Sequence, residues 1–325
     1  TDGSFSGTTN VSGGFGGTHG TGDPNRDGLI GIYQQNLVLP LNGFLFNAIY
    51  SDRTKSNVDS ICEGTTPPTL IGATPKGGSG MYSYQWQKSY DGQSWSDVAG
   101  TSMNYIPVGP ESNTLWFRRI VNDGAGLIST SKPVKIIVHP IITENIVGTD
   151  TTVCFNSDPE MLYPLNSGPA GGTGIYNYLW EESPDNIAWN GASENNTDAY
   201  YDPQALTLTT YYRRLVNSGA CMNTSAPVTV TVLPEIIGNN IQEDQTICEG
   251  STFSNITGAI PSGGPSSTYS YQWMSSDDNI NWNVAEGSST GVGYDPLNDS
   301  PGTLYYRRIV YSGLCQSTSN VVQLT

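Results

Sequence analysis

The stretch Tyr178-Leu179-Trp180, followed by Trp189 and then by Tyr211-Tyr212-Arg213-Arg214, decides the fold because it recurs. The other copies are Tyr84-Gln85-Trp86 with Trp95 and Trp116-Phe117-Arg118-Arg119, and Tyr271-Gln272-Trp273 with Trp282 and Tyr305-Tyr306-Arg307-Arg308. The Tyr-x-Trp motifs begin at residues 84, 178 and 271. From about residue 57 onward the chain therefore consists of three copies of a unit of roughly 90 residues.

Each unit is predicted to be all-β. Residues 82–87 alternate large and polar side chains, which is the period of a half-buried strand. The hairpin turns are expected at Asp91-Gly92, Asp185-Asn186 and Asp278-Asn279, because these residues tolerate positive φ. Six or seven short strands in about 90 residues, without a helical stripe, favour an immunoglobulin-like or fibronectin-like β-sandwich.

We therefore predict a tandem array of three sandwiches, at residues 57–142, 143–236 and 237–325. Residues 1–56 form a Gly/Thr-rich segment with short strands expected at 29–33, 37–41 and 44–50. So short a segment, with few large apolar residues, is not expected to fold alone. It is expected to pack on the first repeat, to complete a preceding domain, or to donate a strand to a neighbouring subunit.

Four of the five cysteines suggest a pairing. Cys154–Cys221 and Cys248–Cys315 have the same spacing and equivalent positions, which predicts these two disulfides. Gly126 stands where the first repeat would carry its second cysteine, so Cys62 is predicted to be unpaired, as a buried thiol or in an intermolecular bridge. Because disulfides persist in oxidising compartments, the chain is expected to be extracellular.

The recurring tryptophans and arginines are interpreted as structural. The residues concerned are Trp86, Trp180, Trp273, Arg119, Arg214 and Arg308. Neighbouring strand residues face opposite sides of a sheet, so one arginine of each pair is expected to cover a strand tryptophan, as Arg214 would cover Trp180. The alternative for the arginines is recognition of carbohydrate or phosphate. The tryptophans Trp95, Trp189 and Trp282 are expected to pack in the core and hairpins, and the alternative for them is stacking on sugars.

One sequence motif suggests a metal. Asp23, Asn25 and Asp27 follow the D-x-N-x-D-G start of a calcium-binding loop, but the twelfth position is Gln34 instead of a bidentate Glu. An Asx-rich turn is the other interpretation. No other cofactor is expected.

Composition excludes several functions. The net charge of −16 argues against nucleic acid as a partner and against docking on an anionic membrane, both of which need clustered Lys and Arg. Apolar runs are far shorter than the ~20 residues that span a bilayer, so direct membrane insertion is not expected. The paired carboxylates Asp277-Asp278 and Glu181-Glu182 are adjacent in sequence and diverge in a strand, and the chain has only two histidines. The chain is therefore not expected to be an enzyme.

The linker before the third repeat and the start of that repeat, residues 233–250, contain a sequence that resembles a known family; we call it the linker phrase. The repeats resemble immunoglobulin-like repeats of very large Bacteroidota cell-surface proteins. The resemblance rests on Leu233-Pro234-Glu235-Ile236-Ile237-Gly238-Asn239-Asn240-Ile241 and Asp244-Gln245-Thr246-Ile247-Cys248-Glu249-Gly250. It also rests on the Tyr-x-Trp and Tyr-Tyr-Arg-Arg motifs and on a diglycine before each Tyr-x-Trp motif, at Gly77-Gly78, Gly171-Gly172 and Gly263-Gly264. These include gliding-motility adhesins and other cargo of type IX secretion. The resemblance implies a secreted, non-enzymatic protein at the cell surface or in a fibre.

The leading hypothesis is therefore a structural repeat region of an extracellular filament or stalk that supports adhesion or gliding motility. Its partners would be neighbouring copies or domains of the same fibre. The alternatives are a self-polymerising subunit that donates a strand from its N-terminal segment, and a carbohydrate-binding module for surface polysaccharide.

Overall fold

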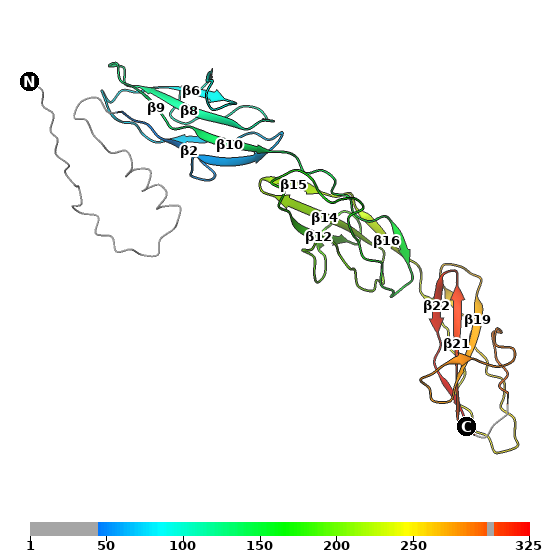
Figure 1. Ribbon diagram of the computed structural model, residues 1–325. Coiled ribbons are helices and arrows are strands. Elements are labelled where there is room, and N and C mark those ends of the chain that lie inside the picture. The colour runs from blue at the N-terminus through cyan, green and yellow to red at the C-terminus, as the bar shows by residue number, and fades with distance from the viewer. Residues whose placement is uncertain (1–44, 298–301) are drawn as a thin grey trace, which may run out of the picture. The chain divides into compact units, whose positions relative to one another are not determined.

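The computed structural model describes residues 45–297 and 302–325, and in these residues every regular element is a β-strand (Figure 1). The chain divides into two units, Thr1–Ile141 and Ile142–Thr325, which are described separately. The first unit contains one sandwich and the second contains two. The fold is a tandem array of immunoglobulin-like or fibronectin-like β-sandwiches, as the sequence predicts. No helix long and apolar enough to cross a membrane occurs in the described residues.

The first sandwich has a large sheet and two short strand pairs. Its strands are β1 (Leu45–Phe46), β2 (Ile49–Ser51), β3 (Val58–Cys62), β4 (Leu70–Gly72), β5 (Lys76–Gly77), β6 (Ser83–Ser89), β7 (Ser96–Val98), β8 (Leu115–Asn122), β9 (Ile128–Thr130) and β10 (Val134–His139). The sheet order is β3-β10-β8-β6-β7, with β9 also paired to β8 and with β3 parallel to β10. The pairs β1–β5 and β2–β4 are antiparallel. Since β1 and β2 belong to this sandwich, it begins upstream of residue 57, where we expected its start.

The second sandwich repeats this large sheet. Its strands are β11 (Thr151–Val153), β12 (Asn177–Ser183), β13 (Asn190–Gly191), β14 (Thr210–Ser218), β15 (Cys221–Thr224) and β16 (Val228–Val232). The order is β11-β16-β14-β12-β13, with β15 paired to β14. Single bridges, Val147 to Pro164 and Leu162 to Tyr201, take the place of the short strands of the opposite layer.

The third sandwich follows the same plan. Its strands are β17 (Ile236–Ile237), β18 (Ser262–Gly263), β19 (Ser270–Ser276), β20 (Asn283–Val284), β21 (Leu304–Ser312), β22 (Cys315–Thr318) and β23 (Val322–Leu324). Its sheet has the order β20-β19-β21-β22, with β23 also paired to β21. Ile236 and Ile237, in the linker phrase, form β17 and pair with β18.

Each core is built around the predicted tryptophan. Trp86, Trp180 and Trp273 are fully buried, and each stacks on a tyrosine with ring centroids 5.5–5.8 Å apart. Those tyrosines, which the sequence analysis did not single out, are Tyr105, Tyr201 and Tyr294. Large aromatic side chains bury much apolar surface, so the tryptophan of each Tyr-x-Trp motif and the tyrosine stacked on it contribute strongly to the core of their unit.

Candidate functional site: the junction between the second and third repeats

The junction begins where β16 ends. The Leu233 N–H donates to the Val153 carbonyl at 2.9 Å, and three residues later the chain enters β17 of the third sandwich. A β-carbon on Gly263 would lie 2.1 Å from the Glu235 carbonyl oxygen, so this close approach of linker and hairpin requires glycine. The linker is therefore held at both ends by backbone contacts.

An apolar cluster fills the junction. Ile236, Val310 and Cys315 of the third repeat are buried together. Partly buried side chains pack on them from both repeats, namely Cys154, Leu233, Tyr269 and Tyr271. Because the cluster draws on both sandwiches, it couples them by removing apolar surface from water.

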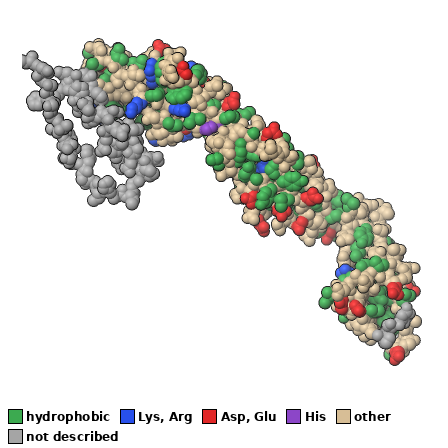
Figure 2. Space-filling model, in the orientation of Figure 1, with side chains coloured by type: hydrophobic (Ala, Val, Ile, Leu, Met, Phe, Trp, Pro, Cys, Tyr) green, Lys and Arg blue, Asp and Glu red, His purple; other side chains and the backbone are tan. Residues whose placement is uncertain are grey.

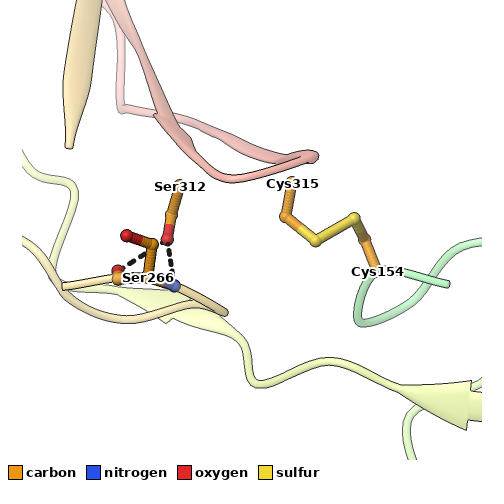
Figure 3. Close-up of a disulfide and its surroundings, with 4 residues drawn as sticks. All are labelled: Cys154, Ser266, Ser312 and Cys315. Carbon is orange, nitrogen blue, oxygen red and sulfur yellow. Dashed lines mark hydrogen bonds between the residues drawn. A yellow bond between two sulfur atoms is a disulfide. The ribbon is translucent and has the colours of Figure 1, made fainter. Parts of the chain in front are cut away.

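A disulfide crosses the same boundary (Figure 3). It joins Cys154, at the end of β11 in the second repeat, to Cys315, at the start of β22 in the third, with 5.5 Å between their Cα atoms and a sequence separation of 161. Beside it, the Ser312 hydroxyl donates to the Ser266 carbonyl at 2.7 Å and accepts from the Ser266 N–H at 2.9 Å. These bonds fix the hairpin that presents Cys315.

The predicted pairings Cys154–Cys221 and Cys248–Cys315 are wrong, and the strand register explains why. Cys154 follows Val153, which lies opposite Val232 at the far end of β16. In β14, Thr210 pairs with Val230 of β16, so this end of β14 lies near Cys154. Cys221 pairs with Ser218, which is eight residues further along β14, at its other end. At ~3.3 Å per residue the two ends of the sandwich are roughly 25 Å apart, far beyond the reach of a disulfide.

The prediction that Cys62 is unpaired is also wrong. Cys62 and Cys221 are both disulfide-bonded. The free cysteine of the described residues is Cys248, which is exposed.

Cys221 and Cys315 are hairpin cysteines, since each lies in the hairpin that follows the Arg-Arg strand of its repeat. The first repeat has no cysteine at this position, but the residue found there is not Gly126 as predicted. The Asp123 N–H donates to the Leu127 carbonyl at 3.1 Å, which matches the pairing of Ser218 with Cys221. Leu127 therefore occupies the cysteine position, because this hairpin loop is one residue longer than the equivalent loop in the second repeat.

The inward arginines, Arg119, Arg214 and Arg308, are fully buried. The expected contact is present: the Arg214 guanidinium lies 5.7 Å from the Trp180 ring centroid and 5.2 Å from that of Tyr178. Burial lowers the pKa of Arg214 and Arg308, and lowers the pKa of Arg119 to about 10, so Arg119 stays charged at neutral pH. These side chains are structural in position, since they are closed off from solvent.

Each buried arginine is held by an asparagine that the sequence analysis missed. The Nε groups of Arg119, Arg214 and Arg308 donate to Asn47, Asn145 and Asn239 at 2.9–3.0 Å. Each asparagine lies about 70 residues upstream, in the segment that leads into its repeat. An asparagine recurs two residues before an isoleucine or valine, in Asn47-Ala48-Ile49, Asn145-Ile146-Val147 and Asn239-Asn240-Ile241. This pattern was the available signal, but nothing in it indicates a buried partner.

The outward arginines cover the second set of tryptophans. Arg118, Arg213 and Arg307 lie 4.1 Å from the ring centroids of Trp95, Trp189 and Trp282. These rings are half-buried, so they belong neither to the core nor to a fully exposed sugar platform. Arg213 also forms an ion pair with Glu181 at 2.7 Å.

The remaining candidates show no catalytic arrangement. Asp278 caps its turn by accepting from the N–H groups of Asn281 and Ile280, and these bonds lower its pKa. In the described part of the chain, no cluster of three His, Cys, Asp or Glu side chains is placed to hold a metal ion. Asp23, Asn25 and Asp27, the calcium candidates, lie outside the described residues.

A family model described as a domain of unknown function (DUF8696) matches three successive parts of the chain, residues 52–140, 143–234 and 237–325. No curated protein matches the chain. Among solved structures, an I-band fragment of titin, I67–I69, is 10% identical, with a TM-score of 0.40 over 86% of this chain and 98% of that one. The FN1–FN3 domains of chicken CNTN1 are 9% identical, with a TM-score of 0.28 over 85% and 97%. The insect immune protein hemolin is 12% identical, with a TM-score of 0.33 over 86% and 76%.

Proposed function

The chain belongs to the DUF8696 family, and we propose that it is a load-bearing segment of an extracellular stalk or filament. The observation that carries this proposal is the Cys154–Cys315 disulfide, because it ties one sandwich to the next instead of stabilising either one. A covalent bond at a domain boundary limits extension and bending of an array, and contributes nothing to catalysis.

The surface supports an extracellular setting. Disulfides persist in oxidising compartments, which agrees with the four bonded cysteines. Acidic side chains are scattered over the visible face of the second unit, with few basic ones (Figure 2). A net charge of −16 keeps such a chain soluble.

The finer proposal is a repeat region of a Bacteroidota cell-surface filament, exported by type IX secretion, that supports adhesion or gliding motility. It rests on the resemblance of the linker phrase and the repeat motifs. Its partners are neighbouring domains of the same fibre. A donated strand from the N-terminal segment is a weaker alternative, because the part of that segment in β1 and β2 pairs within its own chain.

Single-molecule pulling tests the load-bearing role. Handles at Thr149 and at the C-terminus apply force across the second unit alone. In the native chain the cross-repeat disulfide keeps the residues between Cys154 and Cys315 out of the force path. The variant Cys154→Ser with Cys315→Ser is expected to extend by an additional 161 residues, roughly 530–580 Å at ~3.3–3.6 Å per residue. Cys248→Ser is the matched control and should behave as the native chain. Equal extension of the native chain and the double variant overturns the proposal.

A second candidate is binding of surface polysaccharide. The half-buried Trp95, Trp189 and Trp282 favour it, because a ring covered by arginine on one face retains partial exposure. Affinity electrophoresis in polysaccharide gels, with Trp189→Ala as the variant, tests this candidate. Binding through Trp189 is supported if the polysaccharide retards the native chain more than the variant. It is refuted if the native chain migrates equally in gels with and without polysaccharide.

A further inference from the structure

We propose that Cys248 is a covalent attachment site for a further repeat of this fold. Its thiol is one half of a cross-repeat disulfide, and the other half is a cysteine on the hairpin that follows the Arg-Arg strand of that repeat. The inference rests on the proposed function and names the partner of the array.

The equivalent cysteines carry the first argument. Cys62 ends β3, Cys154 directly follows β11, and Cys248 lies at the equivalent place in the third repeat. The three cysteines stand in the motifs Ile-Cys, Val-Cys and Ile-Cys. Cys62 and Cys154 are both disulfide-bonded, and Cys154 is bonded to the hairpin cysteine of the following repeat. Cys248 occupies the same position and is free and exposed.

The local backbone around Cys248 already has the bonded geometry. In each repeat the N–H three residues after the cysteine donates to the cysteine carbonyl, from Thr65 at 3.1 Å, Ser157 at 3.2 Å and Ser251 at 3.0 Å. The residue two positions after the cysteine has positive φ in every case, 80° at Gly64, 55° at Asn156 and 82° at Gly250. The turn that presents the Cys154 sulfur to its partner is therefore also formed at Cys248.

Cys248 also lies at the end of the sandwich where another repeat would dock. In the second repeat, Val153 lies opposite Val232, and the chain then crosses to the third repeat. In the third repeat, Gln245 bridges Leu324 in the same parallel sense, and the Ile247 N–H donates to the Thr325 carbonyl at 2.9 Å. Cys248 thus stands beside the end of β23 as Cys154 stands beside the end of β16.

The partner cysteine does not come from another copy of this chain as it stands. Both hairpin cysteines, Cys221 and Cys315, are already bonded. The hairpin of the first repeat carries Leu127 at that position. The partner is therefore a repeat whose hairpin cysteine is a free thiol.

The bond forms by thiol–disulfide exchange with a small disulfide such as glutathione disulfide. The Cys248 thiolate attacks one sulfur of the oxidant and releases one glutathione thiolate. The hairpin thiolate of the partner repeat then attacks the Cys248 sulfur and releases the second glutathione thiolate. Two protein thiols lose two electrons and two protons, and one glutathione disulfide becomes two thiols.

The test extends the full chain with a fourth repeat. Residues 232–325, with the appended copy of Cys248 replaced by serine, are appended directly after Thr325, and the protein is oxidised with glutathione disulfide. Non-reducing peptide mapping is expected to show Cys248 bonded to the hairpin cysteine of the appended repeat, and maleimide should no longer label Cys248. The matched control replaces only that appended cysteine with serine, and Cys248 should remain labelled. An intact Cys154–Cys315 bond with Cys248 still free in the four-repeat chain overturns the inference alone, whereas absence of Cys154–Cys315 overturns the proposed function as well.

A second arm identifies the source of the partner. The native chain is mixed with a chain carrying Leu127→Cys and Cys248→Ser under the same oxidant. A covalent heterodimer through Cys248 assigns the partner to a separate chain. If only the four-repeat chain forms the bond, the partner is a repeat tethered in the same polypeptide.

Discussion

Arg308 Nε donates to Asn239 Oδ1 at 3.0 Å inside the third sandwich, although the two residues are 69 positions apart in the chain. Asn239 also donates from its amide to the Ser317 carbonyl at 2.8 Å, so one side chain ties the linker to two strands of the sheet. The same arginine–asparagine pair occurs in all three repeats. A buried charge is tolerated in each core because its hydrogen bonds are nearly all supplied by the protein.

Asn239→Ala is expected to destabilise the third repeat by roughly 2–4 kcal/mol, because it removes the acceptor of the buried Arg308 Nε. Urea denaturation measures the change. Asn283→Ala, at an exposed position in β20, is the control and should change the free energy of unfolding by less than about 0.5 kcal/mol. Similar effects of both variants contradict the structural role of Asn239.

Gly258 is required by the same arginine. A β-carbon at this residue would lie 1.9 Å from Arg308 Nη1. Gly258→Ala is therefore expected to cost about 3 kcal/mol or more by displacing the guanidinium from its acceptors. Gly191→Ala is the control, because its β-carbon meets only the end of the Asn196 side chain, at 3.2 Å. Thermal denaturation should lower the Tm for the first variant and leave it nearly unchanged for the second.

Pro164 explains the one irregularity among the three buried arginines. It pairs with Val147 as Gly258 pairs with Ile241, so its ring stands where the other repeats have glycine. Arg119 and Arg308 donate from Nη2 to the Ala73 and Ala259 carbonyls, whereas among the described residues Arg214 Nη2 has no acceptor.

Pro164→Gly is expected to restore that hydrogen bond. The gain from a charged donor, about 1.5–3 kcal/mol, exceeds the ~1 kcal/mol that the lost proline rigidity costs, which leaves a net stabilisation of roughly 1 kcal/mol. Nitrogen-15 NMR of the arginine side chains reports the bond directly. An unchanged Arg214 signal, or a less stable protein, refutes this explanation.

Stability should fall in acid because of the turn aspartates. Hydrogen bonds from the N–H groups of Asn281 and Ile280 lower the pKa of Asp278 below its usual value of 3.8. A carboxyl with a lowered folded-state pKa contributes stability above the unfolded pKa, and that contribution is lost as pH falls below about 4. Urea denaturation between pH 2 and 6 should show this slope, and Asp278→Asn should reduce it. An identical pH profile for the variant contradicts the assignment.

The strand content, the repeat period and the buried tryptophans could be predicted from sequence, because alternation and aromatic spacing are local signals. The pairing of the cysteines could not. In a periodic chain, pairing within a repeat and pairing with the next repeat both give equal spacings, so the equal 67-residue separations of Cys154–Cys221 and Cys248–Cys315 carry no information about which occurs. Only the register, which places Cys154 and Cys221 at opposite ends of one sandwich, separates the two schemes.

The hydrogen-bond partners of the buried arginines could not be predicted from the sequence either. Asn145 and Asn239 lie in linker segments with no strand periodicity, and their role depends on the chain returning to the same core about 70 residues later. Such a contact is set by topology, and sequence patterns report only on neighbours along the chain.

The cross-repeat disulfide also has a consequence for biosynthesis. Cys154 is made 161 residues before Cys315, which at about 5–20 residues per second corresponds to a delay of roughly 8–32 s. During that interval the Cys154 thiol stays reduced, because its partner Cys315 has not yet been synthesised. The covalent link between the second and third repeats can therefore form only after both repeats have been synthesised.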